Sequence, residues 1–281
     1  HPSAMKRTTS IRPELREWIL TTTRAGHSTE EVLRLMKETG YDPRESRGIV
    51  ASVLKLPLAA LTGKATSAAL RPRHPDAPFA DAAGRRVRVS ASLDSPVVRV
   101  LDGLLDADEC DQLIEQARPR LARALTVDTD GRKQVDDRRT SAGMFFRLGE
   151  SPLIERIESR LAALLGVPVS HGEGLQVLHY APGQEYEPHY DWFDPSQPGF
   201  DAVTAHGGQR VASIVMYLNT PEAGGGTCFP HAGLTVTALK GSAVYFAYET
   251  GDTRSLHAGL PVASGEKWIA TKWLRERPFL R

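Results

Sequence analysis

Apolar residues recur three and four positions apart in three stretches within residues 1–55, which is the spacing of amphipathic helices. The first stretch stops at Gly26, the second runs from Ser28 to Gly40, and the third begins at Pro43, a residue favoured in a first helical turn. The apolar positions of the three helices are Leu15, Trp18 and Ile19; Val32, Leu35 and Met36; and Ile49, Val50, Val53 and Leu54. The pattern predicts a small three-helix bundle.

A helix-turn-helix that reads DNA would show a similar pattern, so the charge of the segment decides between the two hypotheses. Ten basic and seven acidic residues lie between Lys6 and Lys55, and no helix is basic along one side. The formal net charge of the chain is +1, which gives no bulk attraction to nucleic acid or to an anionic membrane. We therefore expect a bundle that packs or docks a protein partner, and no nucleic-acid partner.

Residues 56–86 are rich in Pro, Ala and Arg and have no sustained periodicity, which predicts a linker. The segment contains the triplet His74-Pro75-Asp76. Because proline separates the two side chains and no apolar strand flanks them, we expect no metal site there.

Between residues 87 and 281 the pattern changes to short runs of β-branched and aromatic residues separated by Gly and Pro, which is typical of strands. Residues 106–117 and 151–166 have helical spacing instead, and each begins with a capping residue. The predicted strands are "RVRVSA", "VVRVL", "LQVLHY", "RVASIVMYLN", "GTCFP", "LTVTAL", "SAVYFAY", "SLHAGLPV" and "KWIATKWL". The pattern predicts an α+β domain, in which helices buttress an antiparallel barrel or sandwich.

Composition bears on the cellular location of the protein. No apolar run approaches the length of about 20 residues that a membrane helix needs, so no membrane partner is expected. The opening "HPSAMKRTTS" lacks the apolar stretch of a secretory signal, and residues 1–4 before Met5 resemble a tag remnant. Cys110 and Cys228 are too few for a disulfide framework. These features predict a cytoplasmic protein.

The triplet His189-Tyr190-Asp191 is the first candidate for chemistry. Similar triplets, such as His171-Gly172-Glu173, arise by chance, so the neighbourhood must carry the argument. His189 and Asp191 follow a predicted strand and a turn that contains Gly, which places them at the mouth of the barrel. Alternate residues of an extended segment point the same way, so both side chains can reach one ion.

A third ligand is expected from a distant strand end, and His257 in "SLHAGLPV" has that position. Two imidazoles and one carboxylate on one face of an octahedral ion leave three positions open, which is the ligand set of non-haem Fe(II) oxygenases. Zinc hydrolysis with the same ligands is the alternative, although zinc favours a tetrahedral site with one open position.

An iron oxygenase that uses 2-oxoglutarate also needs a cation for the distal carboxylate of this co-substrate. Lys267 lies 10 residues after His257 on the next predicted strand, and alternation places it on the same face as Ile269, Thr271 and Trp273. A lysine in the interior of a barrel is costly without an anion. The alternative is that this face of the strand is exposed to solvent.

Four segments together, "LQVLHYAPGQEYEPHYDWFD", "GGQRVASIVMYLN", "EAGGGTCFP" and "SLHAGLPVASGEKWIATKW", resemble the catalytic domain of prolyl 4-hydroxylases. The resemblance runs from about Val97 to Phe279, and "RRTSAGMFF" is similar to a loop of the family that precedes the barrel. It implies a double-stranded β-helix, or jelly-roll, and 2-oxoglutarate- and Fe(II)-dependent oxygenase activity. On this basis residues 87–281 are the expected catalytic domain.

The resemblance also implies roles for individual residues. His189, Asp191 and His257 correspond to the iron ligands and to the catalytic centre, which Lys267 completes. The residues implied to contact 2-oxoglutarate are Tyr180, Ser213 and Lys267. The residues implied to contact the substrate are Tyr186, Arg139, Trp273 and Arg275, although Tyr186 could equally be a packed aromatic residue and Arg139 a partner in a surface salt bridge.

The expected reaction consumes 2-oxoglutarate and dioxygen, releases succinate and carbon dioxide, and hydroxylates a C–H bond. The resemblance favours a prolyl residue in a peptide or protein, and it brings ascorbate into consideration as a further cofactor. Two alternatives stay open: the same chemistry on a free amino acid, another residue type or a small metabolite, and an inactive barrel that acts as a binding module. A homodimer is also left open.

Overall fold

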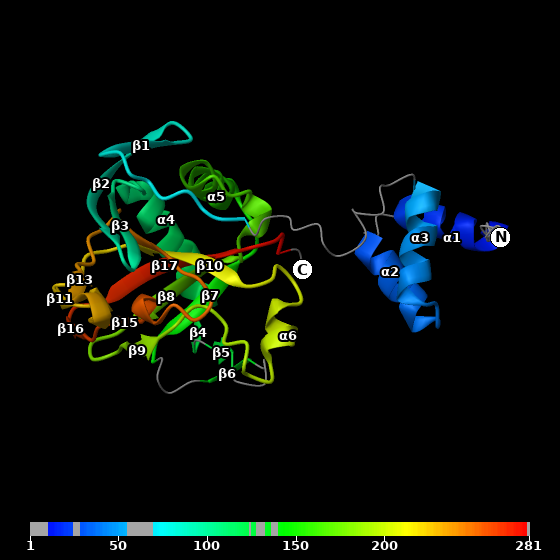
Figure 1. Cartoon of the computed structure of the whole chain (residues 1–281). Helices are drawn as coiled ribbons and strands as arrows, with labels where there is room; N and C mark the ends of the chain where they lie inside the picture. Colours follow the sequence, from blue (N-terminus) through cyan, green and yellow to red (C-terminus); the bar gives the residue numbers. More distant parts are fainter. Residues whose placement is uncertain are drawn as a thin grey trace. The chain divides into compact units, whose positions relative to one another are not determined.

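The protein is described by a computed structural model that covers residues 11–24, 29–54, 70–123, 125–127, 133–135 and 140–279. The chain divides into two compact units, one within residues 1–68 and the other within residues 69–281 (Figure 1). The helices are α1 (Pro13–Arg24), α2 (Thr29–Glu38), α3 (Pro43–Leu54), α4 (Ala107–Ala117), α5 (Pro152–Leu165) and α6 (Phe200–Thr204).

The strands of the second unit alternate with short turns and 3-10 segments. They are β1 (Phe79–Ala82), β2 (Arg85–Asp94), β3 (Val97–Asp102), β4 (Ala122–Arg123), β5 (Leu125–Val127), β6 (Lys133–Val135), β7 (Ala142–Phe146), β8 (Leu175–Tyr180), β9 (Tyr186–His189), β10 (Arg210–Tyr217), β11 (Ala223–Gly224), β12 (Thr227–Phe229), β13 (Leu234–Val236), β14 (Ala243–Ala247), β15 (His257–Gly259), β16 (Val262–Ser264) and β17 (Lys267–Arg275). Every pairing among the described strands is antiparallel, as the sequence predicts.

The first unit contains the three predicted helices, packed around a small apolar core. The core residues with the lowest exposure are Ile19, Val32, Met36, Val50 and Val53. Trp18, which the sequence pattern placed on the buried face, is instead 38% exposed. On α1 the residues that meet the core are Leu15, Ile19 and Leu20, and a residue one position before Ile19 lies at the edge of that face.

The second unit is built on a nine-stranded sheet with the order β1-β2-β3-β14-β10-β17-β8-β7-β4. A second sheet, with the order β13-β12-β15-β9, packs against its inner face. Residues of both sheets form the core between them, including Tyr217, Phe246 and Ile269 from the large sheet and Phe229 and Val236 from the small one. This arrangement is the predicted jelly-roll barrel, and helices α4 and α5 cover the outer face of the large sheet (Figure 1).

The caps of these two helices are those that the sequence predicts. Asp106 caps α4 in a complete capping box with Glu109, and Ser151 caps α5, which ends at Gly166 in the left-handed conformation. Glu109 also accepts two hydrogen bonds from Arg160 of α5, at 2.7 and 2.8 Å, so the capping residue joins the two helices.

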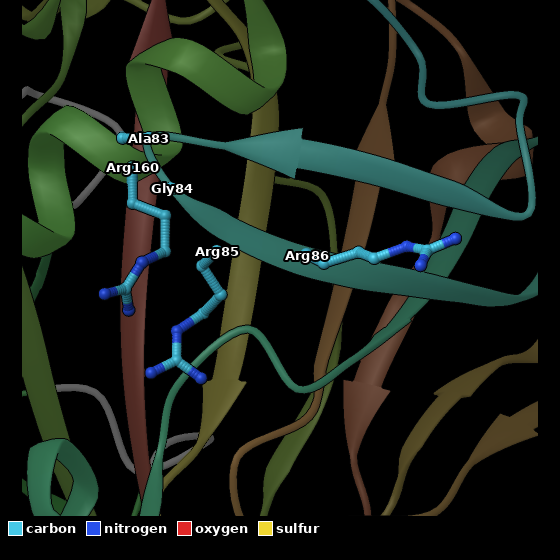
Figure 2. A pocket seen from close by; sticks show the side chains of 5 residues that line it. All are labelled: Ala83, Gly84, Arg85, Arg86 and Arg160. Atoms are coloured by element: carbon cyan, nitrogen blue, oxygen red, sulfur yellow. The ribbon is translucent and has the colours of Figure 1, made fainter.

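A surface pocket lies beside this helix pair, lined by Ala83, Gly84, Arg85, Arg86 and Arg160 (Figure 2). Arg85 and Arg160 point to the same side, whereas Arg86 points away along β2 (Figure 2). Arg85 forms an ion pair with Asp106, and Arg160 forms one with Glu109, so both guanidinium charges are neutralised.

The predicted linker, residues 56–86, extends too far along the chain. Residues 70–86 belong to the second unit, and β1 and the start of β2 are strands of its large sheet. The segment is held by polar contacts that its composition does not reveal: His74 Nδ1 lies 2.9 Å from the Tyr245 hydroxyl, and Arg99 donates to Asp76 at 2.8 Å. His74 and Asp76 therefore have structural partners within the second unit.

Candidate metal centre

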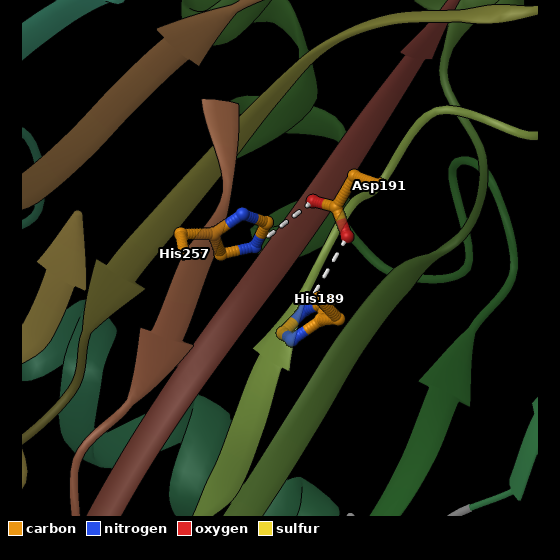
Figure 3. Close-up of side chains that lie close together, drawn as sticks. All are labelled: His189, Asp191 and His257. Atoms are coloured by element: carbon orange, nitrogen blue, oxygen red, sulfur yellow. Dashed lines mark ion pairs between the residues drawn. The ribbon is translucent and has the colours of Figure 1, made fainter. Parts of the chain in front are cut away.

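Two strands of the small sheet bring the three predicted metal ligands together. His189 is the last residue of β9, His257 is the first residue of β15, and the two are direct partners in the antiparallel register. Asp191 lies just beyond β9. One donor atom from each of the three residues can be chosen so that all lie within 4.8 Å of one another, and among the described residues this is the cluster that could hold a metal (Figure 3).

The tautomers of the two imidazoles suit metal binding. His189 Nδ1 lies 2.7 Å from the carbonyl oxygen of Glu187, and His257 Nδ1 lies 3.0 Å from that of Ser255. A carbonyl oxygen can only accept a hydrogen bond, so each Nδ1 carries a hydrogen, and in the neutral imidazole the lone pair is on Nε2. Both Nε2 atoms face Asp191, each 3.6 Å from a carboxylate oxygen. Two neutral imidazoles and one carboxylate are the donor set that fits Fe(II).

The carboxylate of the cluster is buried and ionised. Burial alone would raise the pKa of Asp191, but the adjacent His257 and His189, together with Arg210, lower this pKa to about 2. The side chain is 7% exposed. It therefore offers a full negative charge to an ion at neutral pH, in a place where few water molecules compete for it.

Lys267 lies inside the barrel, as the alternation of β17 predicts. Its side chain is 1% exposed, and its Nζ lies 5.0 Å from the centre of the Tyr180 ring, directly across the register from it. None of the described carboxylates forms an ion pair with this ammonium, and burial lowers the pKa of Lys267 to about 8. A buried cation that pairs with none of the described carboxylates favours the binding of an anionic ligand. The alternative, a solvent-exposed face of β17, is wrong.

Ser213 contacts the carboxylate of the metal cluster. Its hydroxyl donates to Asp191 Oδ2 at 2.6 Å and lies 2.8 Å from the Tyr248 hydroxyl, and the contact with 2-oxoglutarate that the resemblance implied stays a prediction. Its single hydrogen is thus already used by the carboxylate.

The predicted substrate residues have unequal support. The Tyr186 ring stacks on the His189 imidazole, with centroids 3.6 Å apart and an interplanar angle of 19°. Trp273 is buried, and its indole N–H has no acceptor in the described part of the chain. Arg275 is buried as well, and it donates to Glu173 and to backbone carbonyls. Arg139 lies outside the described residues. Contact of these four residues with a substrate stays a prediction.

A largely buried ion network lies next to the cluster, and the sequence did not predict it. Arg210 binds Glu173 through two hydrogen bonds, at 2.7 and 3.0 Å, and its guanidinium lies 4.2 Å from the centre of the Trp273 ring. The same guanidinium donates to the backbone carbonyl of Asp191 at 3.4 Å. Glu173 belongs to the triplet that the sequence analysis used as an example of a chance pairing. No sequence signal would have revealed its role, because its partners lie far along the chain.

The comparisons with known proteins agree with this centre. A family model of the 2OG-Fe(II) oxygenase superfamily matches residues 175–275, a range that includes the three clustered residues and Lys267. Probable prolyl 4-hydroxylase 3 of Arabidopsis thaliana is 40% identical over 203 residues, which are 64% of this chain and 69% of the relative. Prolyl 4-hydroxylase 1 of the same plant is 42% identical over 204 residues, with 65% and 70% of the two chains covered.

A solved structure gives the same result. The viral collagen prolyl hydroxylase of Paramecium bursaria Chlorella virus-1, crystallised as a 2OG complex, is 32% identical with a TM-score of 0.50, and the match covers 63% of this chain and 95% of that one. The fold and the centre thus define a 2-oxoglutarate- and Fe(II)-dependent oxygenase. Within this superfamily the chain belongs to the prolyl 4-hydroxylase family. The predicted fold, enzyme class and dependence on Fe(II) and 2-oxoglutarate are confirmed, and the alternatives of a zinc hydrolase and of an inactive binding module are not needed.

No helix among the described residues combines the length and the apolar character needed to cross a membrane.

Proposed function

We propose that the enzyme hydroxylates prolyl residues in a peptide or protein, with iron held by His189, Asp191 and His257 and the distal carboxylate of 2-oxoglutarate held by Lys267. The observation that carries this assignment is the convergence of two imidazoles and one carboxylate in a barrel that also encloses an ammonium group, which pairs with no carboxylate in the described part of the chain. When bound, Fe(II) with 2-oxoglutarate and dioxygen supplies the oxidising power that replaces a C–H hydrogen by hydroxyl.

The residues of the chain supply position and environment. The protonated Lys267 can bind a carboxylate, and the Tyr180 hydroxyl, across the register from it, is the expected second donor. The apolar core between the sheets surrounds this end of the site, so the ion pair forms away from bulk water. At the other end, the Tyr186 ring covers one face of the His189 imidazole.

The choice of a prolyl substrate rests on the relatives. The matched proteins are named as prolyl 4-hydroxylases, and the matched viral structure is named as a collagen prolyl hydroxylase. Ascorbate as an accessory reductant is part of the same proposal.

The test is a search for hydroxylated product. The purified enzyme is incubated with Fe(II), 2-oxoglutarate and ascorbate, and with proline-containing peptides whose flanking residues vary. Matched peptides with alanine in place of proline, free proline and the inactive His257→Ala variant are the controls. We expect succinate release and the gain of one oxygen on a peptide proline. Oxidation of free proline alone, or of residues other than proline, would overturn the peptide-prolyl assignment.

A further inference from the structure

The iron ligand Asp191 is the end of a buried chain of hydroxyl groups. Ser213 on β10 donates to Asp191 Oδ2 at 2.6 Å, and the Tyr248 hydroxyl, just after β14, lies 2.8 Å from the Ser213 oxygen. Pairing of β10 with β14 sets this juxtaposition, because Ser213 faces Phe246 in the register and Tyr248, two residues further on, lies on the same face. Ser213 is 0% and Tyr248 5% exposed, so bulk water has little access to either hydroxyl.

The donor and acceptor in each of these hydrogen bonds follow from the number of hydroxyl hydrogens available. Ser213 has one hydroxyl hydrogen, and the ionised carboxylate can only accept it. Tyr248 must therefore donate to the Ser213 oxygen, which gives the order Tyr248 to Ser213 to Asp191. Successive hydrogen bonds polarise one another, so the tyrosine strengthens the bond that the serine makes.

These hydrogen bonds make the two carboxylate oxygens of Asp191 different from each other. Asp191 Oδ1 lies 3.6 Å from His189 Nε2, and Oδ2 lies 3.6 Å from His257 Nε2, so the distances to the imidazoles do not choose between them. The bond from Ser213 engages Oδ2 alone. Nothing in the described part of the chain donates to Oδ1.

We infer that Ser213 and Tyr248 are positioning residues that hold Oδ2, so that Asp191 offers the metal a single oxygen. Together with two imidazoles, one carboxylate oxygen would leave three positions of an octahedral ion open, whereas a bidentate carboxylate would leave two. The chelating end of 2-oxoglutarate and dioxygen together require three. This inference rests on the proposed function, since it assigns the three clustered residues to the metal.

Hydrogen bonds to metal ligands are commonly worth a 10- to 100-fold change in metal affinity. The test measures the dissociation constant of the full-length protein for Co(II), a stable substitute for Fe(II). We expect Ser213→Ala to weaken Co(II) binding about 10-fold or more, and Tyr248→Phe to weaken it by a smaller factor. Ser213→Thr, which keeps the hydroxyl, should restore the parental affinity.

The double variant tests whether Tyr248 acts through Ser213. If it does, Ser213→Ala combined with Tyr248→Phe binds Co(II) no more weakly than Ser213→Ala alone. Tyr245→Phe is the matched control, because it removes a buried tyrosine hydroxyl that contacts His74 instead, and it should leave the affinity unchanged. A second readout is the affinity of the Co(II)-loaded protein for 2-oxoglutarate, which should fall in Ser213→Ala, where both oxygens can bind the ion.

Parental Co(II) affinity in Ser213→Ala, or fully additive losses in the double variant, would overturn the inference. Both results leave the proposed function intact. Failure of the parent protein itself to bind Co(II) would instead contradict the proposed function. Tyr248→Phe keeps the ring and Ser213→Thr keeps the hydroxyl, so a folded variant is available even if Ser213→Ala unfolds.

Discussion

His189 and His257 are separated by 68 positions in the chain, yet they face each other directly across the β9–β15 register. The ring centroids lie 4.3 Å apart, and both Nδ1 atoms are held by backbone carbonyls two residues earlier in the chain. The same local geometry thus occurs on both strands. It points both Nε2 atoms at Asp191, so the three donor groups converge on one place.

Removal of one imidazole should abolish metal binding and turnover. We expect His257→Ala to lose both, because Asp191 and His189 alone leave an incomplete ligand set. Co(II) titration and succinate release measure the two effects. His206→Ala is the matched control, since His206 is exposed and lies outside the cluster, and it should behave as the parent protein. Retention of metal binding by His257→Ala would contradict the assignment.

Loss of the Lys267 ammonium should weaken 2-oxoglutarate binding specifically. A charge-assisted hydrogen bond contributes about 1.5–3 kcal/mol, so Lys267→Ala should raise the KM for 2-oxoglutarate about 10- to 100-fold. Lys272→Met is a useful comparison, because Lys272 is a buried lysine of the same strand that pairs with Glu158 at 2.6 Å instead. That variant should lower the free energy of unfolding and leave the KM for 2-oxoglutarate near that of the parent. An unchanged KM in Lys267→Ala would refute the assigned role.

The pH dependence of 2-oxoglutarate binding should follow Lys267. Burial lowers the pKa of its ammonium to about 8, and a bound carboxylate would raise it again. Binding above pH 8 therefore requires the uptake of a proton, and affinity should fall by up to about tenfold per pH unit above that point. Calorimetric titration of the Co(II)-loaded protein between pH 7 and pH 9 measures the effect. Lys267→Arg, which stays charged throughout, should show a much flatter profile.

Glu109 should contribute to stability except in acid. Burial raises the pKa of its carboxyl, but the hydrogen bonds from Arg160, the Asp106 backbone and Arg156 outweigh this effect and lower the pKa from 4.5 to about 2. A folded-state pKa below the unfolded value means that the stabilisation is complete above about pH 4.5 and is lost as the pH falls towards 2. The shift corresponds to about 3 kcal/mol.

Urea unfolding of Glu109→Gln and of the parent at pH 7, 5 and 3.5 tests this prediction. The variant should be less stable at pH 7, and the difference should narrow as the pH falls below 5. Glu150→Gln is the control, because Glu150 pairs with the half-exposed Arg120 and such pairs contribute about 1 kcal/mol or less. A difference for Glu109→Gln that does not depend on pH would be inconsistent with the shifted pKa.

Several features of the protein could be predicted from local sequence. The helix boundaries at Asp106, Ser151 and Gly166 follow from caps and turns, which act over a few residues. The inward orientation of Lys267 follows from strand alternation beside Ile269. His189 and Asp191 could be proposed from alternation in an extended segment and His257 from its place at a distant strand end, and the resemblance to a family supported the same three residues.

The tertiary structure decided the remaining features. It gave His74 and Asp76 structural partners, placed Glu173 in a network with Arg210 and Arg275, and turned Ser213 towards Asp191 and Tyr248. In each case the partners come from distant parts of the chain and meet only in the folded structure. Caps, turns and side-chain alternation are local properties that a sequence encodes directly, whereas the partner of a buried polar group depends on how the whole chain packs.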